Sequence, residues 1–130
     1  MNDGRRLRIL LVENHADTRL SLTLLLEQCG HAVTGAGTMQ EALDLLSLQE
    51  WDVLLSDIGL PDGSGWELMG RAQPRREPYA IAMSGYGMNA DRARSLAAGF
   101  RHHLVTPMAL EQLEEILQHV EPVAAGGAAP

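Results

Sequence analysis

The sequence predicts an α/β fold with a doubly wound, five-stranded parallel sheet and five helices. Short apolar runs, typical of strands buried on both faces, alternate with longer segments of helix-forming residues. Right-handed crossovers between such strands make the sheet parallel. For five strands in a domain of this size we expect the strand order 2-1-3-4-5, with a switch point between the first and third strands.

The composition indicates one soluble globular domain. The chain has 130 residues, 45% of them hydrophobic and 21% charged, which allows one core but not two domains of ordinary size. Its formal net charge of -7 argues against direct binding to nucleic acid. No apolar run is long enough to cross a bilayer and no apolar signal segment follows the first basic residues, so we expect a cytoplasmic protein without a membrane partner.

The first two predicted strands enclose one helix. Residues 8–12 form a nearly continuous apolar run, and residues 32–36 form a weaker one. Between them, residues 16–28 are good helix formers, and Gly30 follows as a stop signal. We expect Cys29, the single cysteine, to be a buried core thiol that makes no disulfide.

The second and third helices begin with the same signal. Thr38 with Glu41, and Ser64 with Glu67, have the S/T-x-x-E spacing of a capping box. An apolar stripe follows each box, at positions 39, 42, 43 and 46 and at positions 66, 68 and 69. The third strand, residues 52–57, lies between these helices.

The last part of the chain adds two strands and two helices. We expect strands at 79–84 and 100–105, a helix between them with Asn89 as its N-cap, and a final helix over 110–120. The small residues of 122–130 look like a flexible tail or linker, so the predicted domain is 1–121.

Polar side chains stand where four of these strands end, which is the edge where open α/β sheets place their sites. They are Glu13, Asn14, Asp57, Ser84 and Thr106. In the strand order 2-1-3-4-5 the first and third strands are neighbours, so Glu13 and Asn14 are expected beside Asp57. Asp57 is therefore the first candidate for chemistry.

These residues resemble the receiver domain of two-component response regulators, from Ile9 to about Val120. The most specific matches are Ser56-Asp57-Ile58-Gly59-Leu60-Pro61 with Gly65, Met83-Ser84-Gly85, Ala98-Gly99-Phe100, and His103-Leu104-Val105-Thr106-Pro107. The resemblance implies a flavodoxin-like fold and a signalling protein, not an enzyme.

The resemblance also implies a role for each site residue. Asp57 accepts a phosphoryl group from a histidine kinase or phosphotransfer protein, and Ser84 donates a hydrogen bond to that group. Mg²⁺ is bound by Glu13, Asn14, Asp57 and the backbone carbonyl of Gly59. A hard dication is needed because a carboxylate that attacks an anionic phosphoryl group must have the charge repulsion offset.

The same family implies a partner surface. The fourth helix, the fifth strand and the fifth helix form the expected homodimer or partner face. Its charged residues are Arg92, Arg94, His102, Glu111, Glu114 and Glu115.

Three positions depart from the family pattern. Glu13 and Asn14 replace two aspartates, so we expect weaker Mg²⁺ binding. Thr106 occupies the position of a lysine that would pair with the phosphoryl group, and all ten basic residues of the chain are arginines. His103 occupies the position of an aromatic switch residue, and imidazole titrates near neutrality. We therefore expect slower phosphorylation, or weaker coupling of phosphorylation to conformation.

Two other functions compete with the phosphoacceptor. One is an atypical receiver that acts as a protein-interaction module with little or no phosphorylation. The other is a flavodoxin-like nucleotide or cofactor binder, which ranks last because no Gly-rich phosphate loop follows the first strand and Glu13 would repel phosphate.

Local alternatives also stay open for single residues. Asn14 is as well explained as a helix cap as by metal ligation. Thr106 is better explained as a structural residue before Pro107 than as a catalytic one, and a cis peptide bond between the two is one option. His102 and His103 are adjacent in a strand, so they face opposite ways and a shared metal site is not expected.

Overall fold

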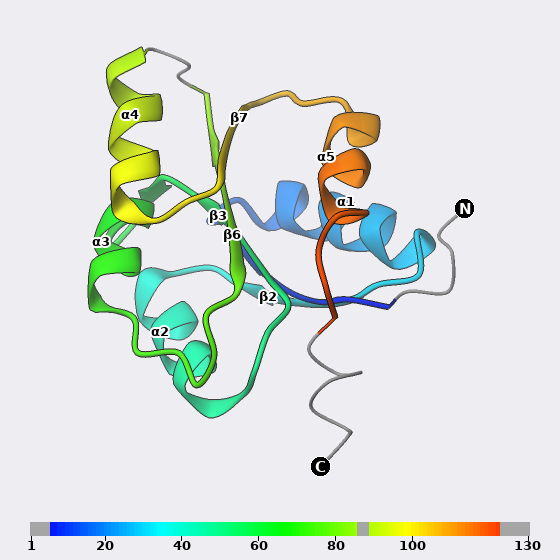
Figure 1. Ribbon diagram of the computed structural model, residues 1–130, viewed down its shortest axis with the longest axis horizontal. Coiled ribbons are helices and arrows are strands. Elements are labelled where there is room, and N and C mark those ends of the chain that lie inside the picture. The colour runs from blue at the N-terminus through cyan, green and yellow to red at the C-terminus, as the bar shows by residue number, and fades with distance from the viewer. Residues whose placement is uncertain (1–5, 86–88, 123–130) are drawn as a thin grey trace.

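The computed structural model describes residues 6–85 and 89–122. Strands and helices alternate along the chain (Figure 1). The predicted tail, residues 122–130, lies outside the described residues except for Pro122. The elements are β1 (Arg8–Val12), α1 (Ala16–Gln28), β2 (Ala32–Ala36), α2 (Met39–Leu48), β3 (Val53–Asp57), β4 (Gly59–Leu60), β5 (Gly63–Ser64), α3 (Gly65–Arg71), β6 (Tyr79–Ser84), α4 (Asn89–Ala98), β7 (His102–Val105) and α5 (Leu110–Leu117).

Five of the strands form one parallel sheet in the order β2-β1-β3-β6-β7. Because β6 and β7 are the fourth and fifth strands of this sheet, the predicted order 2-1-3-4-5 is confirmed. Val12 lies opposite Ser56, and Asp57 lies opposite Met83. The carboxyl ends of β1, β3 and β6 therefore meet at one edge.

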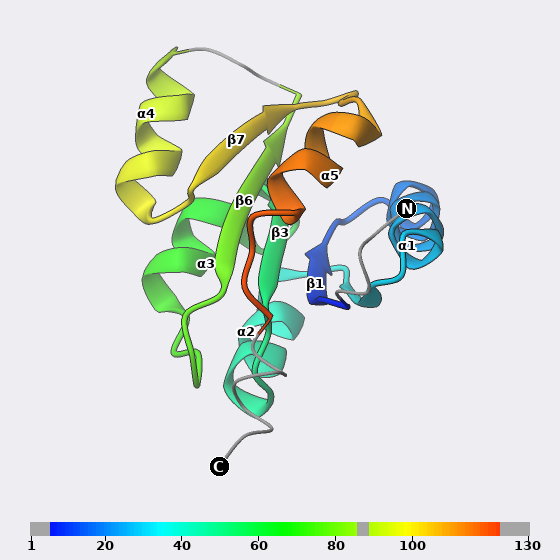
Figure 2. The same cartoon turned by 45° about the vertical axis from the view of Figure 1, so that its right-hand side comes forward.

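Helices cover both faces of the sheet (Figures 1 and 2). On one face α1 and α5 contribute Leu26 and Leu113 to a core with Leu11. On the other face α2 and α3 pack on Leu10 and Leu54. Side chains alternate between the faces of a strand, so each central strand supplies both cores and must be apolar throughout.

Both capping boxes start helices. The Thr38 Oγ1 accepts the N–H of Glu41 at 3.1 Å, and the Ser64 Oγ accepts the N–H of Glu67 at 3.0 Å. The Glu41 carboxylate accepts the N–H of Gly37 at 2.7 Å, one residue before the N-cap. In each predicted capping box, the hydrogen bond to the hydroxyl of the N-cap residue is therefore confirmed.

The main unpredicted element is the antiparallel hairpin of β4 and β5. Its strands have two residues each, too short for any hydrophobic period to reveal. Smaller differences concern element ends: β3 begins at Val53, β7 begins at His102, α5 ends at Leu117, and α4 begins at Asn89 itself. Element ends are the least specific part of a sequence pattern.

The prediction of a core position for Cys29 is wrong. Cys29 is the C-cap of α1 and is half-buried, because a residue at a helix end reaches the surface. Its thiol donates to a carboxylate oxygen of Glu114 in α5 at 3.0 Å. Burial and the neighbouring Glu114 raise the pKa of the thiol to about 11. Cys29 is therefore a protonated contact between two helices.

Among the described residues, no helix combines the length and the apolar content that crossing a bilayer requires.

Candidate functional site

Asp57 is the last residue of β3 and is half-buried at the carboxyl edge of the sheet. Burial raises the pKa of its carboxyl group, and the negative charge of Glu13 raises it further. The N–H of Gly59 donates to Asp57 Oδ1 at 3.3 Å and partly offsets this. The carboxylate is thus in a site that favours the approach of positive charge.

Glu13 follows β1 and is 6% exposed. Its backbone N–H donates to the Ala36 carbonyl at 2.9 Å, its own carbonyl accepts Arg19 Nη1 at 2.6 Å, and its Oε2 accepts the N–H of His15 at 2.9 Å. The stem of Arg19 crosses β2 at Gly35, where an added Cβ would lie 2.9 Å from Arg19 Cδ. Glu13 is therefore fixed from three directions beside Asp57.

Positive charge is scarce at this edge. His15 is exposed, and its Nδ1 lies 3.8 Å from Glu13 Oε2. Within residues 6–85 and 89–122, neither Asp57 nor the Glu13 carboxylate has an arginine at ion-pair distance, since Arg19 contacts the Glu13 carbonyl instead. Asn14 is exposed.

Ser84 and Thr106 extend the same edge. Ser84 lies one residue beyond Met83, which is opposite Asp57, and it is 6% exposed. Thr106 follows Val105, the partner of Ser84, and donates its N–H to the Ser84 carbonyl at 2.8 Å. Thr106 is exposed, and the Thr106–Pro107 peptide bond is cis. The neutral side chain of Thr106 brings no charge to this edge.

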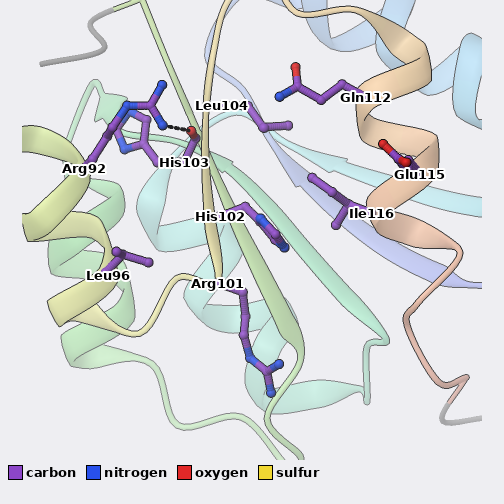
Figure 3. A pocket seen from close by; sticks show the side chains of 9 residues that line it. All are labelled: Arg92, Leu96, Arg101, His102, His103, Leu104, Gln112, Glu115 and Ile116. Atoms are coloured by element: carbon purple, nitrogen blue, oxygen red, sulfur yellow. Dashed lines mark hydrogen bonds between the residues drawn. The ribbon is translucent and has the colours of Figure 1, made fainter. Parts of the chain in front are cut away.

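The two adjacent histidines of β7 face opposite ways, as predicted (Figure 3). His103 is buried with its Nδ1 2.7 Å from Ser95 Oγ, which also accepts the Trp66 indole N–H at 2.9 Å. His102 is half-buried, with its Nε2 2.9 Å from the Tyr79 hydroxyl. Ser95 was missed by sequence reasoning, because a serine in a polar helix carries no distinguishing signal.

The β4–β5 hairpin is attached to the start of α2 by Asp62. Its Oδ1 accepts the N–H of Met39 at 2.7 Å, and its Oδ2 accepts the N–H of Gln40 at 3.0 Å. The bond from Met39, followed by that from Gln40, lowers the pKa of Asp62. This carboxylate supplements the Thr38 cap, so the loop after Asp57 is held by a helix that is distant in sequence.

Gly65 closes this loop onto β3. Its N–H donates to the Ile58 carbonyl at 2.8 Å, and an added Cβ would lie 2.8 Å from the carbonyl oxygen of Asp57. Backbone cannot yield as a flexible side chain does, so this position requires glycine.

The donor set of this edge fits a hard divalent cation. Mg²⁺ is bound in proteins by one or two carboxylates, with water completing its shell. Here the carboxylates of Glu13 and Asp57 are close enough to interact. No group of three or more His, Cys, Asp or Glu side chains in the described part of the chain could hold a metal, so further ligands would have to be amide, backbone or water oxygens. Gly59 contacts Asp57 through its N–H.

A groove of about 430 Å³ lies between α4, β7 and α5 (Figure 3). Its charged lining includes Arg92, Arg101 and Glu115. Two residues expected on this face are engaged elsewhere: Arg94 stacks on Trp66, with its guanidinium carbon 4.0 Å from the ring centroid, and Glu114 accepts the thiol of Cys29.

Comparison with known proteins agrees with this geometry. The chain matches the family model of the response regulator receiver domain over residues 9–118. It is 37% identical over 113 residues to the uncharacterized 14.6 kDa protein of the sodA1 3' region in Leptolyngbya boryana, covering 85% of this chain and 86% of that protein. It is 32% identical over 113 residues to the response regulator protein PilR of Pseudomonas aeruginosa, covering 86% of this chain but 25% of PilR.

Solved structures have the same fold. Chemotaxis protein CheY4 of Vibrio cholerae matches with a TM-score of 0.82 and 22% identity, covering 90% of this chain and 100% of that chain. A CheY-like receiver domain protein of Methanospirillum hungatei matches with a TM-score of 0.80 and 30% identity, covering 88% and 92%. With a family model matched over most of its length, this chain belongs to the response regulator receiver domain family of two-component signalling.

Proposed function

We propose that this receiver domain is a phosphoacceptor and that Asp57 is the residue modified. The observation that carries the proposal is the half-buried carboxylate of Asp57 beside the fixed carboxylate of Glu13, at the sheet edge where Ser84 also ends a strand. Two carboxylates without an arginine partner suit a site that takes up a cation and an anionic group together.

In the proposed step a carboxylate oxygen of Asp57 attacks phosphorus. A P–O bond forms to Asp57 while the bond from phosphorus to the donor breaks, and the donor leaves with that electron pair. The product is an acyl phosphate. The hydroxyl of Ser84 donates a hydrogen bond to a phosphoryl oxygen, which stabilises the added negative charge.

Receiver domains generally bind Mg²⁺ at the phosphorylation site. Here Glu13, Asn14, Asp57 and the Gly59 carbonyl would hold it, and its charge would offset the repulsion between carboxylate and phosphoryl group. We expect weaker binding than with two aspartates, because Asn14 is neutral and exposed.

The rate is expected to be low because the chain has no lysine and, within residues 6–85 and 89–122, no arginine lies at ion-pair distance from Asp57 or Glu13. Thr106 occupies the lysine position with a neutral side chain. His103, at the switch position, is already buried and hydrogen-bonded. Both observations favour the second candidate, an interaction module with little or no phosphorylation.

One experiment separates the two candidates. The protein is incubated with acetyl phosphate and Mg²⁺, and intact mass is followed with time. The phosphoacceptor predicts slow addition of one phosphoryl group that Asp57→Asn and removal of Mg²⁺ by EDTA both abolish. No addition over hours supports the interaction module, and rapid complete addition contradicts the expected defect.

Receiver domains interact with histidine kinases or phosphotransfer proteins. We propose that such a donor docks on α1, which starts three residues after Glu13 and exposes Leu20 at 58% and Leu24 at 51%. These leucines are four residues apart, so they form one stripe suited to an apolar partner helix. Substitution of both by Gln should slow transfer from a donor protein but not from acetyl phosphate.

The α4–β7–α5 face is the proposed homodimer surface. Arg92 and Arg101 on one side of its groove and Glu115 on the other are complementary under a twofold axis. Light scattering of the wild type and of Glu115→Arg tests this: reversal of the charge should lower the dimer fraction, and an unchanged fraction contradicts the assignment.

We also propose that the domain ends near residue 121, that 122–130 is a tail or linker, and that the protein is cytoplasmic and binds neither nucleic acid nor membrane.

A further inference from the structure

Helix α4 is attached to the fold differently from its neighbours. Among the described residues of α4 only Ser95 is buried, and it is polar. Leu96, the one large aliphatic side chain of this helix, is 57% exposed. By contrast, α5 buries Leu113 and Leu117. Apolar burial therefore contributes little to holding α4 in place.

Ser95 connects three elements through one oxygen. Ser95 is fully buried, with 0% of its surface exposed. Its Oγ lies 2.9 Å from Trp66 Nε1 of α3 and 2.7 Å from His103 Nδ1 of β7. An indole N–H can only donate, so the hydroxyl oxygen accepts from Trp66. The single hydroxyl proton is then available for His103.

Two arginines of α4 reinforce these contacts. Arg92 Nη1 donates to the His103 carbonyl at 3.2 Å, and the Arg94 guanidinium lies 4.0 Å from the centre of the Trp66 ring. Both arginines are exposed, so water weakens these contacts relative to the buried ones. The buried hydroxyl is the central contact of the set.

We propose that Ser95 is a positioning residue and that Trp66, Ser95 and His103 form a polar latch that holds α4 against α3 and β7. In the latch, Ser95 accepts from Trp66 and donates to His103 Nδ1, so the neutral imidazole carries its proton on Nε2. The latch sets the shape of the α4–β7–α5 groove, because Arg92 and Leu96 of α4 line it.

The latch goes beyond the proposed phosphorylation and does not depend on it. Loss of the hydroxyl leaves the Trp66 N–H and His103 Nδ1 without their shared partner in a buried place, which is costly. Because no described residue of α4 has a buried apolar side chain to oppose its detachment, we expect α4 to open locally while the sheet stays folded.

Amide hydrogen exchange on the whole chain tests this. In Ser95→Ala we expect amides in the second half of α4, residues 94–98, to exchange at least about tenfold faster than in the wild type, with α2 and α5 unchanged. Ser95→Cys, with a weaker donor and acceptor, should be intermediate. The matched control is Ser47→Ala in α2, whose exposed hydroxyl donates only to the Asp44 carbonyl of its own helix.

Unchanged exchange in α4, or equal acceleration throughout the domain, overturns the latch. Ring ¹⁵N shifts of His103 give a second readout, because a proton on Nδ1 in the wild type contradicts the donor assignment of Ser95. Should Ser95→Ala fail to fold, Trp66→Phe removes the other donor, keeps an aromatic ring and should also accelerate exchange in α4.

Discussion

Two halves of this receiver domain hold their polar residues in different ways. The acceptor half, defined as β1, β3, the β4–β5 hairpin and α2, fixes carboxylates by backbone N–H groups: Glu13 by His15, and Asp62 by Met39 and Gln40. The read-out half, defined as β6, β7 and α4, joins two of its elements through the side chains of Ser95 and His103. Charge is therefore concentrated where a phosphoryl group would arrive and is missing at Thr106, where it would be sensed.

The helices of the two halves also differ in the side chains that they bury. α2 buries Met39, Ala42 and Leu46, whereas α4 buries only Ser95 among its described residues. A helix held by apolar area resists opening in proportion to that area. A helix held by one buried hydroxyl and a few exposed polar contacts is expected to open locally when that hydroxyl is lost. The acceptor half is preorganised, and the read-out half is adjustable.

The largest expected effect contrasts one leucine from each half. Leu46→Ala in α2 should lower the free energy of unfolding by about 2–5 kcal/mol, because Leu46 is 1% exposed and its loss leaves a cavity. Leu96→Ala in α4 should change it by no more than about 0.5 kcal/mol. Urea denaturation measures both. If both variants lose a similar amount of unfolding free energy, the proposed difference between α2 and α4 is wrong.

A positive charge added at position 106, directly after β7, should speed phosphorylation. Thr106→Lys places an ammonium group at the sheet edge, and we expect phosphorylation by acetyl phosphate to become about tenfold faster, because a charged donor stabilises the transferred oxygens. Thr106→Gln, similar in length but neutral, is the matched control and should stay at the wild-type rate. If both variants react alike, missing charge is not the cause of slow phosphorylation.

Loosening the acceptor half tests its preorganisation. Asp62→Ala removes the acceptor for two amides, so Met39 and Gln40 should exchange faster and stability should fall less than in Leu46→Ala. The folded state lowers the pKa of Asp62, so its contribution is present above the unfolded pKa and is lost as pH falls through the folded value. The difference between Asp62→Ala and the wild type should therefore shrink in acid.

The smallest effect concerns Asp57, since a half-exposed carboxylate is partly screened by water. Its pKa is raised above the ordinary 3.8, so the folded state binds its proton more tightly than the unfolded state does. Stability from this group is present below the unfolded pKa and is lost as pH rises through the folded one. Asp57→Asn should thus be more stable than the wild type at neutral pH, and thermal melts should show the gain disappearing in acid.

Sequence patterns predicted the sheet, its order and the strand ends with polar residues, because these follow from burial and periodicity. They did not predict the β4–β5 hairpin, the attachment of Asp62 to α2 or the role of Ser95. Each of these joins segments that are distant in sequence, and nothing local distinguishes Ser95 from any helix serine or Asp62 from any turn aspartate. The prediction that Cys29 lies in the core was wrong for a related reason. Cys29 caps the end of a helix, and its partial exposure follows from that position rather than from the chemistry of its side chain.

Gly65 joins the start of α3 to the end of β3. The start of α3 rests on the backbone of Asp57 with no room for even a methyl group. The Gly65 N–H also donates to the Ile58 carbonyl at 2.8 Å, so the first turn of α3 is attached directly to the end of β3. The next residue of this turn is Trp66, whose indole bonds to Ser95. Asp57 and Ser95 are thus linked through Gly65 and Trp66, two adjacent residues at the start of α3.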